Sequence, residues 1–145
     1  MAEQEVLDSA TGWVAEHTRK YVETDGAEGH EWRGVKTLVL TTKGRRSGKL
    51  RRNALIYGQD GDRYLVVASK GGAPTHPLWF RNLEADRNVH VQVGAEKFSA
   101  RARIASPEEK ARLWPIMTAV WLAYNDYQAK TERDIPVVIL EPRRA

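Results

Sequence analysis

Residues 35–69 read VKTLVLTTKGRRSGKLRRNALIYGQDGDRYLVVAS. Strand-forming β-branched, aromatic and aliphatic residues recur in 35–42, 51–58 and 63–69, each of which has the length of a β-strand. The last two runs are separated by Asp60-Gly61, a strong hairpin signal because this pair accepts the positive φ angles of a two-residue turn. The stretch therefore predicts a meander of three antiparallel strands.

The loop between the first two strands concentrates positive charge. Lys43–Arg52, the basic loop, contains six Lys or Arg residues and no carboxylate. Such charges repel one another unless an anion lies between them. Gly44 and Gly48 allow the backbone to approach closely, so that peptide N–H groups can join the guanidinium groups around an anion. The basic loop is predicted to bind an anion, and a solvated hairpin loop is the alternative.

Regular patterns continue on both sides of the meander. An amphipathic helix is expected over residues 5–22, packed on the domain or touching a membrane surface. The stripe on this helix consists of Val6, Ala10, Trp13, Val14, His17 and Tyr21. Pro77 suits the first position of a helix that reaches Ala85, and residues 89–104 alternate as a second hairpin.

The C-terminal part is predicted to hold a long helix and a last strand. Residues 106–109 form a capping box with proline at the first helical position. Pro115 is expected to kink or split this helix, because its ring removes a hydrogen-bond donor. The apolar run 135–140 closes the chain. The order α-βββ-α-ββ-αα-β favours an α+β fold in which about six antiparallel strands form a small barrel with helices at its ends.

Composition fits a single globular domain. The chain has 145 residues, and we expect 1–28 to form the helix and a linker and 29–145 to form the barrel. It contains no cysteine, which excludes disulfides and thiolate metal sites. No run of 18 apolar residues occurs, so a cytoplasmic location is expected. The net charge of +4 favours a negatively charged ligand.

Several catalytic motifs are incomplete. Gly44–Lys49 is one residue shorter than a P-loop, and Leu50 stands where that motif needs Ser or Thr to bind Mg²⁺. Ser47 lies in G-x-x-S-G rather than in the G-x-S-x-G of hydrolases. The four histidines show no metal-ligand spacing, so no metal site is predicted. An anion site with aromatic residues nearby remains, and it suits a phosphorylated flat cofactor.

Spaced motifs resemble the deazaflavin (coenzyme F420)-dependent nitroreductase and quinone reductase family. They occur in the family's order between residues 29 and 142 and comprise Gly44–Arg51, Asp60-Gly61, Val67–Gly72, Pro77–Leu83 and Val91–Val93. The resemblance implies a split β-barrel related to those that bind FMN. It also implies an oxidoreductase that holds reduced coenzyme F420 and passes hydride to a quinone, a nitroaromatic or another electron-poor acceptor.

The matching positions imply a cofactor site. Arg45, Arg46 and Ser47 would hold the phosphate, and Arg51 would hold the phosphate or the glutamate tail. The ring would lie between two groups of residues, namely Arg52, Asn53, Ala54, Leu55, Ile56, Val67, Ala68, Ser69 and Lys70 on one side and Leu78, Trp79, Phe80, Arg81 and Asn82 on the other.

A hydroxyl near the ring would stabilise or protonate the acceptor, which gains charge with the hydride. Tyr124 matches a family position that lies over the ring and contacts the substrate. Ser69 and Tyr127 are the secondary candidates for this catalytic role.

The acceptor pocket departs from the family pattern at Ala54, Lys70 and Trp121, so nitroimidazole activity is not assumed. A quinone is the expected acceptor, and weak membrane contact of the N-terminal helix would be useful for reaching it. Two alternatives stay open: a related barrel that binds FMN, and a non-enzymatic module that binds nucleic acid or anionic lipid. Nucleic acid is the least favoured partner, because the basic residues lack an aromatic stacking platform.

Overall fold

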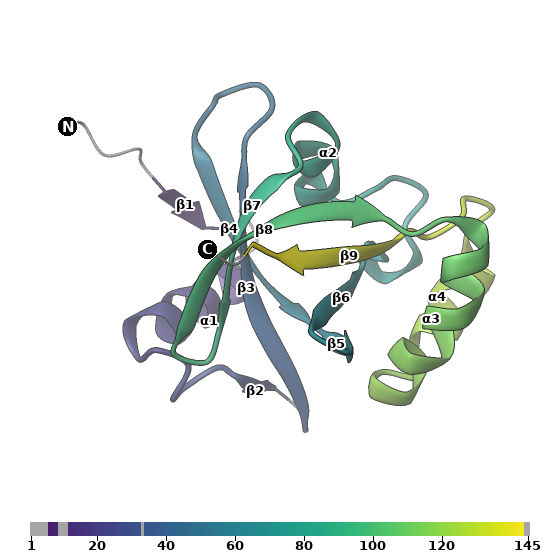
Figure 1. Cartoon of the computed structure of the whole chain (residues 1–145), viewed down its shortest axis with the longest axis horizontal. Helices are drawn as coiled ribbons and strands as arrows, with labels where there is room; N and C mark the ends of the chain where they lie inside the picture. The colour runs from purple at the N-terminus through teal and green to yellow at the C-terminus, as the bar shows by residue number, and fades with distance from the viewer. Residues whose placement is uncertain (1–5, 9–11, 33, 144–145) are drawn as a thin grey trace.

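The computed structural model describes residues 6–8, 12–32 and 34–143 of the chain. Its elements follow the order in Figure 1. They are β1 (Val6–Asp8), α1 (Gly12–Glu23), β2 (Glu31–Trp32), β3 (Val35–Lys43), β4 (Leu50–Ile56), β5 (Gly58–Asp60), β6 (Arg63–Val67), the 3₁₀ helix η1 (Lys70–Gly72), α2 (Leu78–Ala85), β7 (Asn88–Val93), β8 (Glu96–Ile104), α3 (Pro107–Val120), α4 (Tyr124–Lys130) and β9 (Val137–Pro142).

The strands form a mainly antiparallel sheet that curls on itself (Figure 1). Neighbouring strands follow the order β1-β4-β3-β7-β8-β9-β6-β5, and β2 pairs with β3 outside this path. The six strands that the sequence predicts are present as β3, β4, β6, β7, β8 and β9, and β7 and β8 form the predicted second hairpin, so the split β-barrel is confirmed. The predicted meander was wrong beyond the β3–β4 hairpin, because β6 pairs with β9 and with the short β5, and not with β4. The short strands β1, β2 and β5 are additions to the barrel.

The N-terminal region differs from the single helix predicted over residues 5–22. β1 pairs in parallel with the start of β4, and the helix begins only at Gly12. Residues 5 and 9–11 of the predicted helix lie outside the described residues. The prediction was wrong about β1 because periodicity reports local spacing alone, whereas β1 forms by pairing with the otherwise open edge of β4.

Pro115 lies inside α3 and does not split it. The hydrogen bond that proline removes would have reached the carbonyl of Ala111, four residues earlier. Both residues are exposed, so water can satisfy that carbonyl. The predicted second helix begins instead beyond a short turn after Val120, as α4.

Two hydrophobic cores use opposite faces of β6 and β9. The barrel interior includes Leu38, Leu40, Val66, Phe80, Leu83, Val138 and Leu140. The second core lies under α3 and α4 and includes Leu65, Val67, Leu113, Met117, Tyr124, Val137 and Ile139. Alternate residues of β9 therefore enter different cores, which explains why this strand is apolar from Val137 to Leu140.

Tyr21 ties α1 to the barrel. Its side chain is fully buried, and its hydroxyl donates to the carbonyl of Thr37 at 2.9 Å and accepts from the N–H of Gly94 at 2.7 Å. Burial raises the pKa of Tyr21 to about 12, so the hydroxyl keeps the proton that it donates. Gly26 packs so closely on Gly94 that a Cβ there would lie 2.5 Å from the Gly94 Cα. The end of α1 is thus fixed against the β7–β8 turn.

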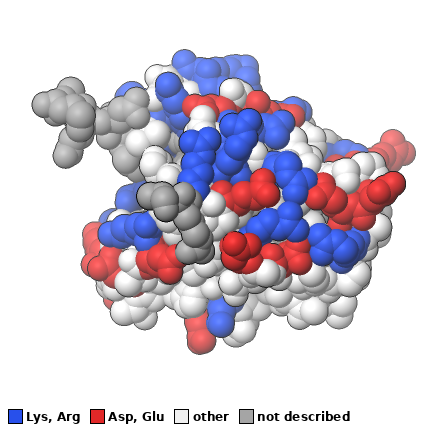
Figure 2. All heavy atoms as spheres, in the orientation of Figure 1, with Lys and Arg blue, Asp and Glu red and all other residues white. Residues whose placement is uncertain are grey.

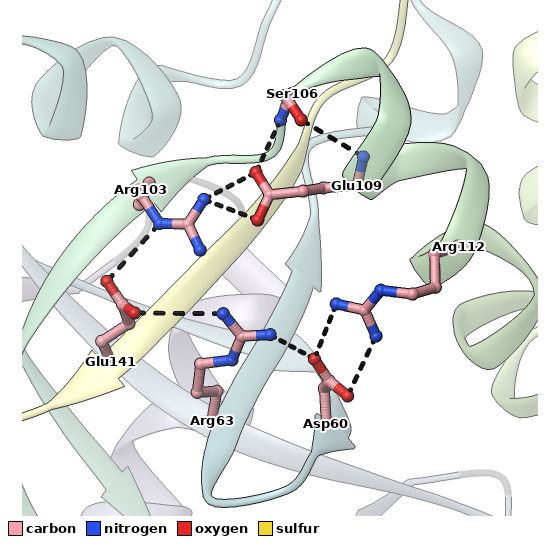
Figure 3. A network of polar contacts seen from close by, with 7 residues as sticks. All are labelled: Asp60, Arg63, Arg103, Ser106, Glu109, Arg112 and Glu141. Carbon is pink, nitrogen blue, oxygen red and sulfur yellow. Dashed lines mark hydrogen bonds and ion pairs between the residues drawn. The ribbon is translucent and has the colours of Figure 1, made fainter.

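A line of charged residues, the ion-pair chain, joins α3 to the sheet (Figure 3). Its members, in order of contact, are Arg112, Asp60, Arg63, Glu141, Arg103 and Glu109. Glu109 accepts from Arg103 at 2.6 and 2.7 Å and completes the predicted capping box with Ser106. The Arg103 guanidinium, followed by the Ser106 N–H, lowers the pKa of Glu109 to about 2. Every arginine of the ion-pair chain therefore contacts a carboxylate.

Candidate functional site

A cavity of about 1010 Å³ opens between the basic loop, β4, the β6–α2 connection and the start of α4. This volume lies at the upper end of the range for small-molecule sites. Most of the predicted site residues line it, namely Arg45, Arg46, Ser47, Arg51, Asn53, Ala54, Leu55, Ile56, Val67, Ser69, Lys70, Leu78, Trp79, Asn82, Tyr124 and Tyr127. Segments far apart in sequence thus meet around one space.

The predicted site residues that do not line this cavity are Arg52, Ala68, Phe80 and Arg81. Phe80 is buried in the barrel core, and Arg81 pairs with Glu84 at 2.9 Å. Ala68 is fully buried, and Arg52 lines a smaller pocket that it shares with residues of β3, β7 and β8. A role of these four residues in cofactor binding stays a prediction.

The basic loop closes on itself through backbone hydrogen bonds. The Gly44 N–H donates to the Lys49 carbonyl at 2.7 Å, and the Gly48 N–H donates to the Gly44 carbonyl at 2.8 Å. A Cβ on Gly44 would lie 2.7 Å from the Ser47 Oγ and 3.1 Å from the Lys49 carbonyl oxygen. Glycine is therefore required at position 44 by close approach within the loop.

Asn82 connects the basic loop to α2 and β3. Its Oδ1 accepts from the backbone N–H of Arg45 at 3.1 Å, and its Nδ2 donates to the Thr42 Oγ1 at 3.2 Å. The side chain is buried, so both bonds are protected from water. The loop backbone is thereby fixed at the point where its arginines begin.

Three arginines of the basic loop have no carboxylate partner in the described part of the chain. They are Arg45, Arg46 and Arg51, and all three line the cavity. Figure 2 shows Lys and Arg side chains along the upper edge of the molecule, where Figure 1 places the β3–β4 turn. Guanidinium groups bind phosphate and carboxylate groups in a bidentate manner, so this side of the cavity favours an anionic ligand.

Tyr124 begins α4, and only 4% of its surface is exposed. Its ring packs against Trp114 and Tyr127, with centroids 6.2 and 6.0 Å away. Burial, and then the neighbouring Tyr127, raise the pKa of the Tyr124 hydroxyl well above its ordinary value. Because this hydroxyl makes no hydrogen bond within the described ranges, a protonated phenol that lines the cavity is left to donate to a ligand.

Ser69 and Lys70 line the cavity at the end of β6. Lys70 has a φ of +46°, a conformation that residues other than glycine adopt only when their surroundings hold them there. The next turn packs on α4 so closely that a Cβ on Gly72 would lie 2.7 Å from the Tyr127 carbonyl oxygen. This wall of the cavity is therefore in direct contact with the helix that carries Tyr124.

Several lining residues were missed by the sequence analysis. His17 and Trp32 also border the cavity, and the Trp32 ring lies 5.6 Å from the Trp121 ring. Trp32 is placed there because β2 pairs with β3, a contact that no local pattern around it signals. His17 lies on the predicted helical stripe and was interpreted as a packing residue, but it borders the cavity.

Comparison with known proteins identifies the family. The profile of the F420H(2)-dependent quinone reductase family matches residues 13–142. The F420H(2)-dependent quinone reductase Rv1261c of Mycobacterium tuberculosis is 40% identical over 131 residues, which is 88% of either chain.

Two solved structures share the fold of this chain and much of its sequence. One, described as a domain-swapped dimer, is 37% identical with a TM-score of 0.71 over 92% of this chain and 100% of that one. The other, an F420-H2 dependent reductase (FDR-A), is 39% identical with a TM-score of 0.68 over 72% of this chain and 93% of that one. The chain therefore belongs to the F420H(2)-dependent quinone reductase family, whose members are oxidoreductases that use coenzyme F420.

Proposed function

We propose that the cavity binds reduced coenzyme F420 and that the protein directs its hydride to a quinone, with nitroaromatic compounds as a second class of acceptor. The observation that carries this proposal is the meeting, around one cavity, of the Tyr124 hydroxyl and guanidinium groups that have no carboxylate partner among the described residues. The guanidinium groups suit the anionic part of the coenzyme. The hydroxyl suits an acceptor that becomes more negative as it is reduced.

Arg45, Arg46, Ser47 and Arg51 hold the phosphate and the acidic tail. Their side chains border the cavity. The conformation of the basic loop that carries them is fixed by its hydrogen bond to Asn82 and by the close approach at Gly44. Charge-assisted hydrogen bonds from guanidinium groups are among the stronger polar contacts in proteins. These residues therefore supply most of the affinity.

The strand β4 and the segment 67–70 frame the ring, and the first turn of α2 lines the same space with Leu78 and Trp79. When bound, the reduced coenzyme supplies a hydride, which carries two electrons and one proton. The protein's part is orientation, because holding a donor and an acceptor in reactive geometry removes much of the entropic barrier.

Tyr124 donates a hydrogen bond to the acceptor oxygen, on which negative charge develops. A quinone that gains a hydride still needs one proton to become a hydroquinone, and solvent supplies it, because a phenol with a raised pKa does not give up its proton readily. The raised pKa keeps the Tyr124 hydroxyl protonated throughout the physiological pH range. A buried phenol is therefore a donor whose charge does not vary with pH in the cell.

Substitution of Tyr124 by phenylalanine tests this proposal. We expect Tyr124→Phe to bind coenzyme F420 as the wild type does and to lower kcat by about tenfold to a hundredfold, because only the hydrogen-bond donor to the acceptor is lost. Reoxidation of the reduced coenzyme, followed by absorbance with a panel of quinones and nitro compounds, measures the rate.

Tyr127→Phe tests the secondary candidate, because Tyr127 lines the same cavity and its hydroxyl, which accepts from the Trp121 indole at 3.4 Å, keeps its own proton to donate. A larger loss of kcat in Tyr127→Phe than in Tyr124→Phe would give the role to Tyr127. Equal rates for Tyr124→Phe and the wild type would reduce Tyr124 to a packing residue. A wild type that bound FMN as tightly as F420 would point to a flavin barrel instead.

Weak membrane contact through α1 belongs to the same proposal. No helix within the described ranges is long and apolar enough to span a bilayer. Lys20 and Arg19 face solvent on α1, where they pair with Glu16 and Glu23 at 3.6 and 3.9 Å. Pairs this exposed are weak and leave the cations free to meet anionic lipid, so co-sedimentation with vesicles of anionic and neutral lipid tests the contact.

A further inference from the structure

Arg133 lies between α4 and β9 and directs its whole guanidinium group at one distant segment. Its Nε donates to the Ala73 carbonyl at 2.8 Å, its Nη2 to the Ser69 carbonyl at 2.7 Å, and its Nη1 to the Ala68 carbonyl at 3.2 Å. The same Nη1 lies 3.1 Å from the Nδ1 of His76. All four partners belong to residues 68–76, the connection from β6 to α2.

The partners of Arg133 are neutral. No carboxylate forms an ion pair with it in the part of the chain that the structure describes. Partial burial lowers the pKa of its guanidinium, so placing the charge there has a cost that the four hydrogen bonds must offset. Only a planar fork of N–H donors reaches all four acceptors at once, whereas lysine presents its donors at a single atom. The site therefore selects the shape of arginine rather than its charge.

The segment that Arg133 holds is a wall of the cofactor cavity. Ser69, Lys70 and Gly71 line the cavity, and the segment leads directly into Pro77 and Leu78, which also line it. The left-handed Lys70 lies between the acceptors Ser69 and Ala73, at φ +46°. Hydrogen bonds on both sides of a strained residue keep it in that conformation.

Arg133 is itself held by α4. Gln128 donates from Nε2 to the Arg133 carbonyl at 2.8 Å, and its Oε1 accepts from the Ile135 N–H at 3.0 Å. Gln128 lies on the same helix as Tyr124. A continuous path of hydrogen bonds therefore runs from the helix that carries Tyr124 to the wall that faces the cofactor.

We propose that Arg133 is a positioning residue that fixes residues 68–76 relative to α4, and so sets the cofactor-facing wall relative to Tyr124. The proposal rests on the proposed function of the cavity. It has a consequence outside that function: because Arg133 donates to Nδ1, the imidazole of His76 is neutral and carries its proton on Nε2. The burial of His76, followed by the charge of Arg133, lowers its pKa in the same sense.

The test compares Arg133→Lys with Arg103→Lys. Arg103 is also an arginine with several hydrogen bonds, but it belongs to the ion-pair chain and does not line the cavity. Tryptophan fluorescence gives the dissociation constant for F420, because Trp79 lines the cavity. Steady-state assays separate kcat from KM, and ¹⁵N NMR reports the tautomer of His76. Far-ultraviolet circular dichroism and thermal melts measure folding.

We expect Arg133→Lys to raise the dissociation constant for F420 by about tenfold and to lower kcat, because the wall and Tyr124 lose their alignment. His76 should lose its fixed Nε2–H tautomer. Arg103→Lys should lower Tm by about as much as Arg133→Lys does, while its dissociation constant for F420 stays within about twofold of the wild-type value.

An unchanged dissociation constant and kcat in Arg133→Lys would overturn the positioning role. A His76 protonated on Nδ1 in the wild-type protein would overturn it as well, and this result does not depend on any variant folding. A wild type that bound no F420 would refute the proposed function alone, since the tautomer of His76 in the wild type and in Arg133→Lys would still decide the role of Arg133.

Discussion

Arg103 and Arg45 carry the same guanidinium group in opposite surroundings. Arg103 belongs to the ion-pair chain, where it contacts Glu109 and Glu141 (Figure 3). Arg45 belongs to the basic loop, where it lines a cavity and has no carboxylate partner among the described residues. Arg103 is thus neutralised by carboxylates of the protein itself, whereas no described carboxylate neutralises Arg45.

The difference separates charges that are paired within the fold from charges that we propose to bind a ligand. Exposed ion pairs contribute little one by one, but a connected chain with members on α3, β5, β6, β8 and β9 fixes these elements relative to one another. Neighbouring unpaired cations repel one another and cost stability. They lie on a loop whose shape is held by Asn82, and the proposed binding of an anionic ligand accounts for them where folding does not.

Removing two cations from the basic loop should have the largest effect. We expect the double variant Arg45→Ala, Arg51→Ala to weaken F420 binding by about a hundredfold, since each charge-assisted hydrogen bond is worth about 1.5 kcal/mol or more. Its Tm should stay the same or rise slightly, because repulsion is relieved. Fluorescence titration and thermal melts measure the two quantities.

The matched control is Arg19→Ala, Lys20→Ala, which removes the same charge from α1. Equal affinities in the two double variants would show that net charge alone attracts the ligand. The basic loop would then have no binding role of its own, and its contrast with the ion-pair chain would be lost.

A change of loop shape should have an intermediate effect. Gly44→Ala keeps every charge but places a Cβ 2.7 Å from the Ser47 Oγ and 3.1 Å from the Lys49 carbonyl oxygen, so the Ser47 side chain and the adjoining backbone must shift. We expect about tenfold weaker F420 binding with little change in Tm, because displaced donors no longer converge on the phosphate. Wild-type affinity in this variant would mean that the arginines bind the ligand without a preformed turn.

A change in the ion-pair chain should affect stability and not F420 binding. Glu109→Gln should lower Tm by a few degrees and leave F420 binding unchanged, because it removes a capping carboxylate and the partner of Arg103. The low pKa of Glu109 means that its contribution is complete above the unfolded pKa of about 4.3 and is lost as pH falls toward 2.

Calorimetry from pH 7 to pH 2 should therefore show the Tm difference between the wild type and Glu109→Gln shrinking as pH falls. A difference that stayed constant over this range would remove Glu109 from the charges that stabilise the fold. Loss of F420 binding in this variant at pH 7 would link the ion-pair chain to the site.

Much of the fold follows from local patterns. Strand composition predicts β3, β4 and β6, Asp60-Gly61 predicts the turn between β5 and β6, and the capping box predicts the start of α3. The pairing of β6 with β9 in place of β4 was not predicted, because it joins segments far apart in the chain. The basic loop is visible because the sequence itself contains its unusual charge. Features of this kind depend on residues that are close together in the chain, so the sequence alone predicts them.

The remaining features depend on contacts between distant segments. Arg133 was missed because its partners are backbone carbonyls and a histidine 57–65 residues earlier, and carbonyls have no signature in a sequence. Trp32 reaches the cavity only through the pairing of β2 with β3. The strand β1 likewise exists only because β4 offers it an edge.

The buried amide of Asn82 also bears on the speed of complex formation. Because it orders the start of the basic loop in the protein alone, the loop loses its conformational entropy during folding and not on ligand arrival. Stopped-flow traces should then show a single phase whose rate rises linearly with ligand concentration. The unpaired arginines should make that association rate fast and sensitive to salt, as expected for an encounter guided by long-range attraction.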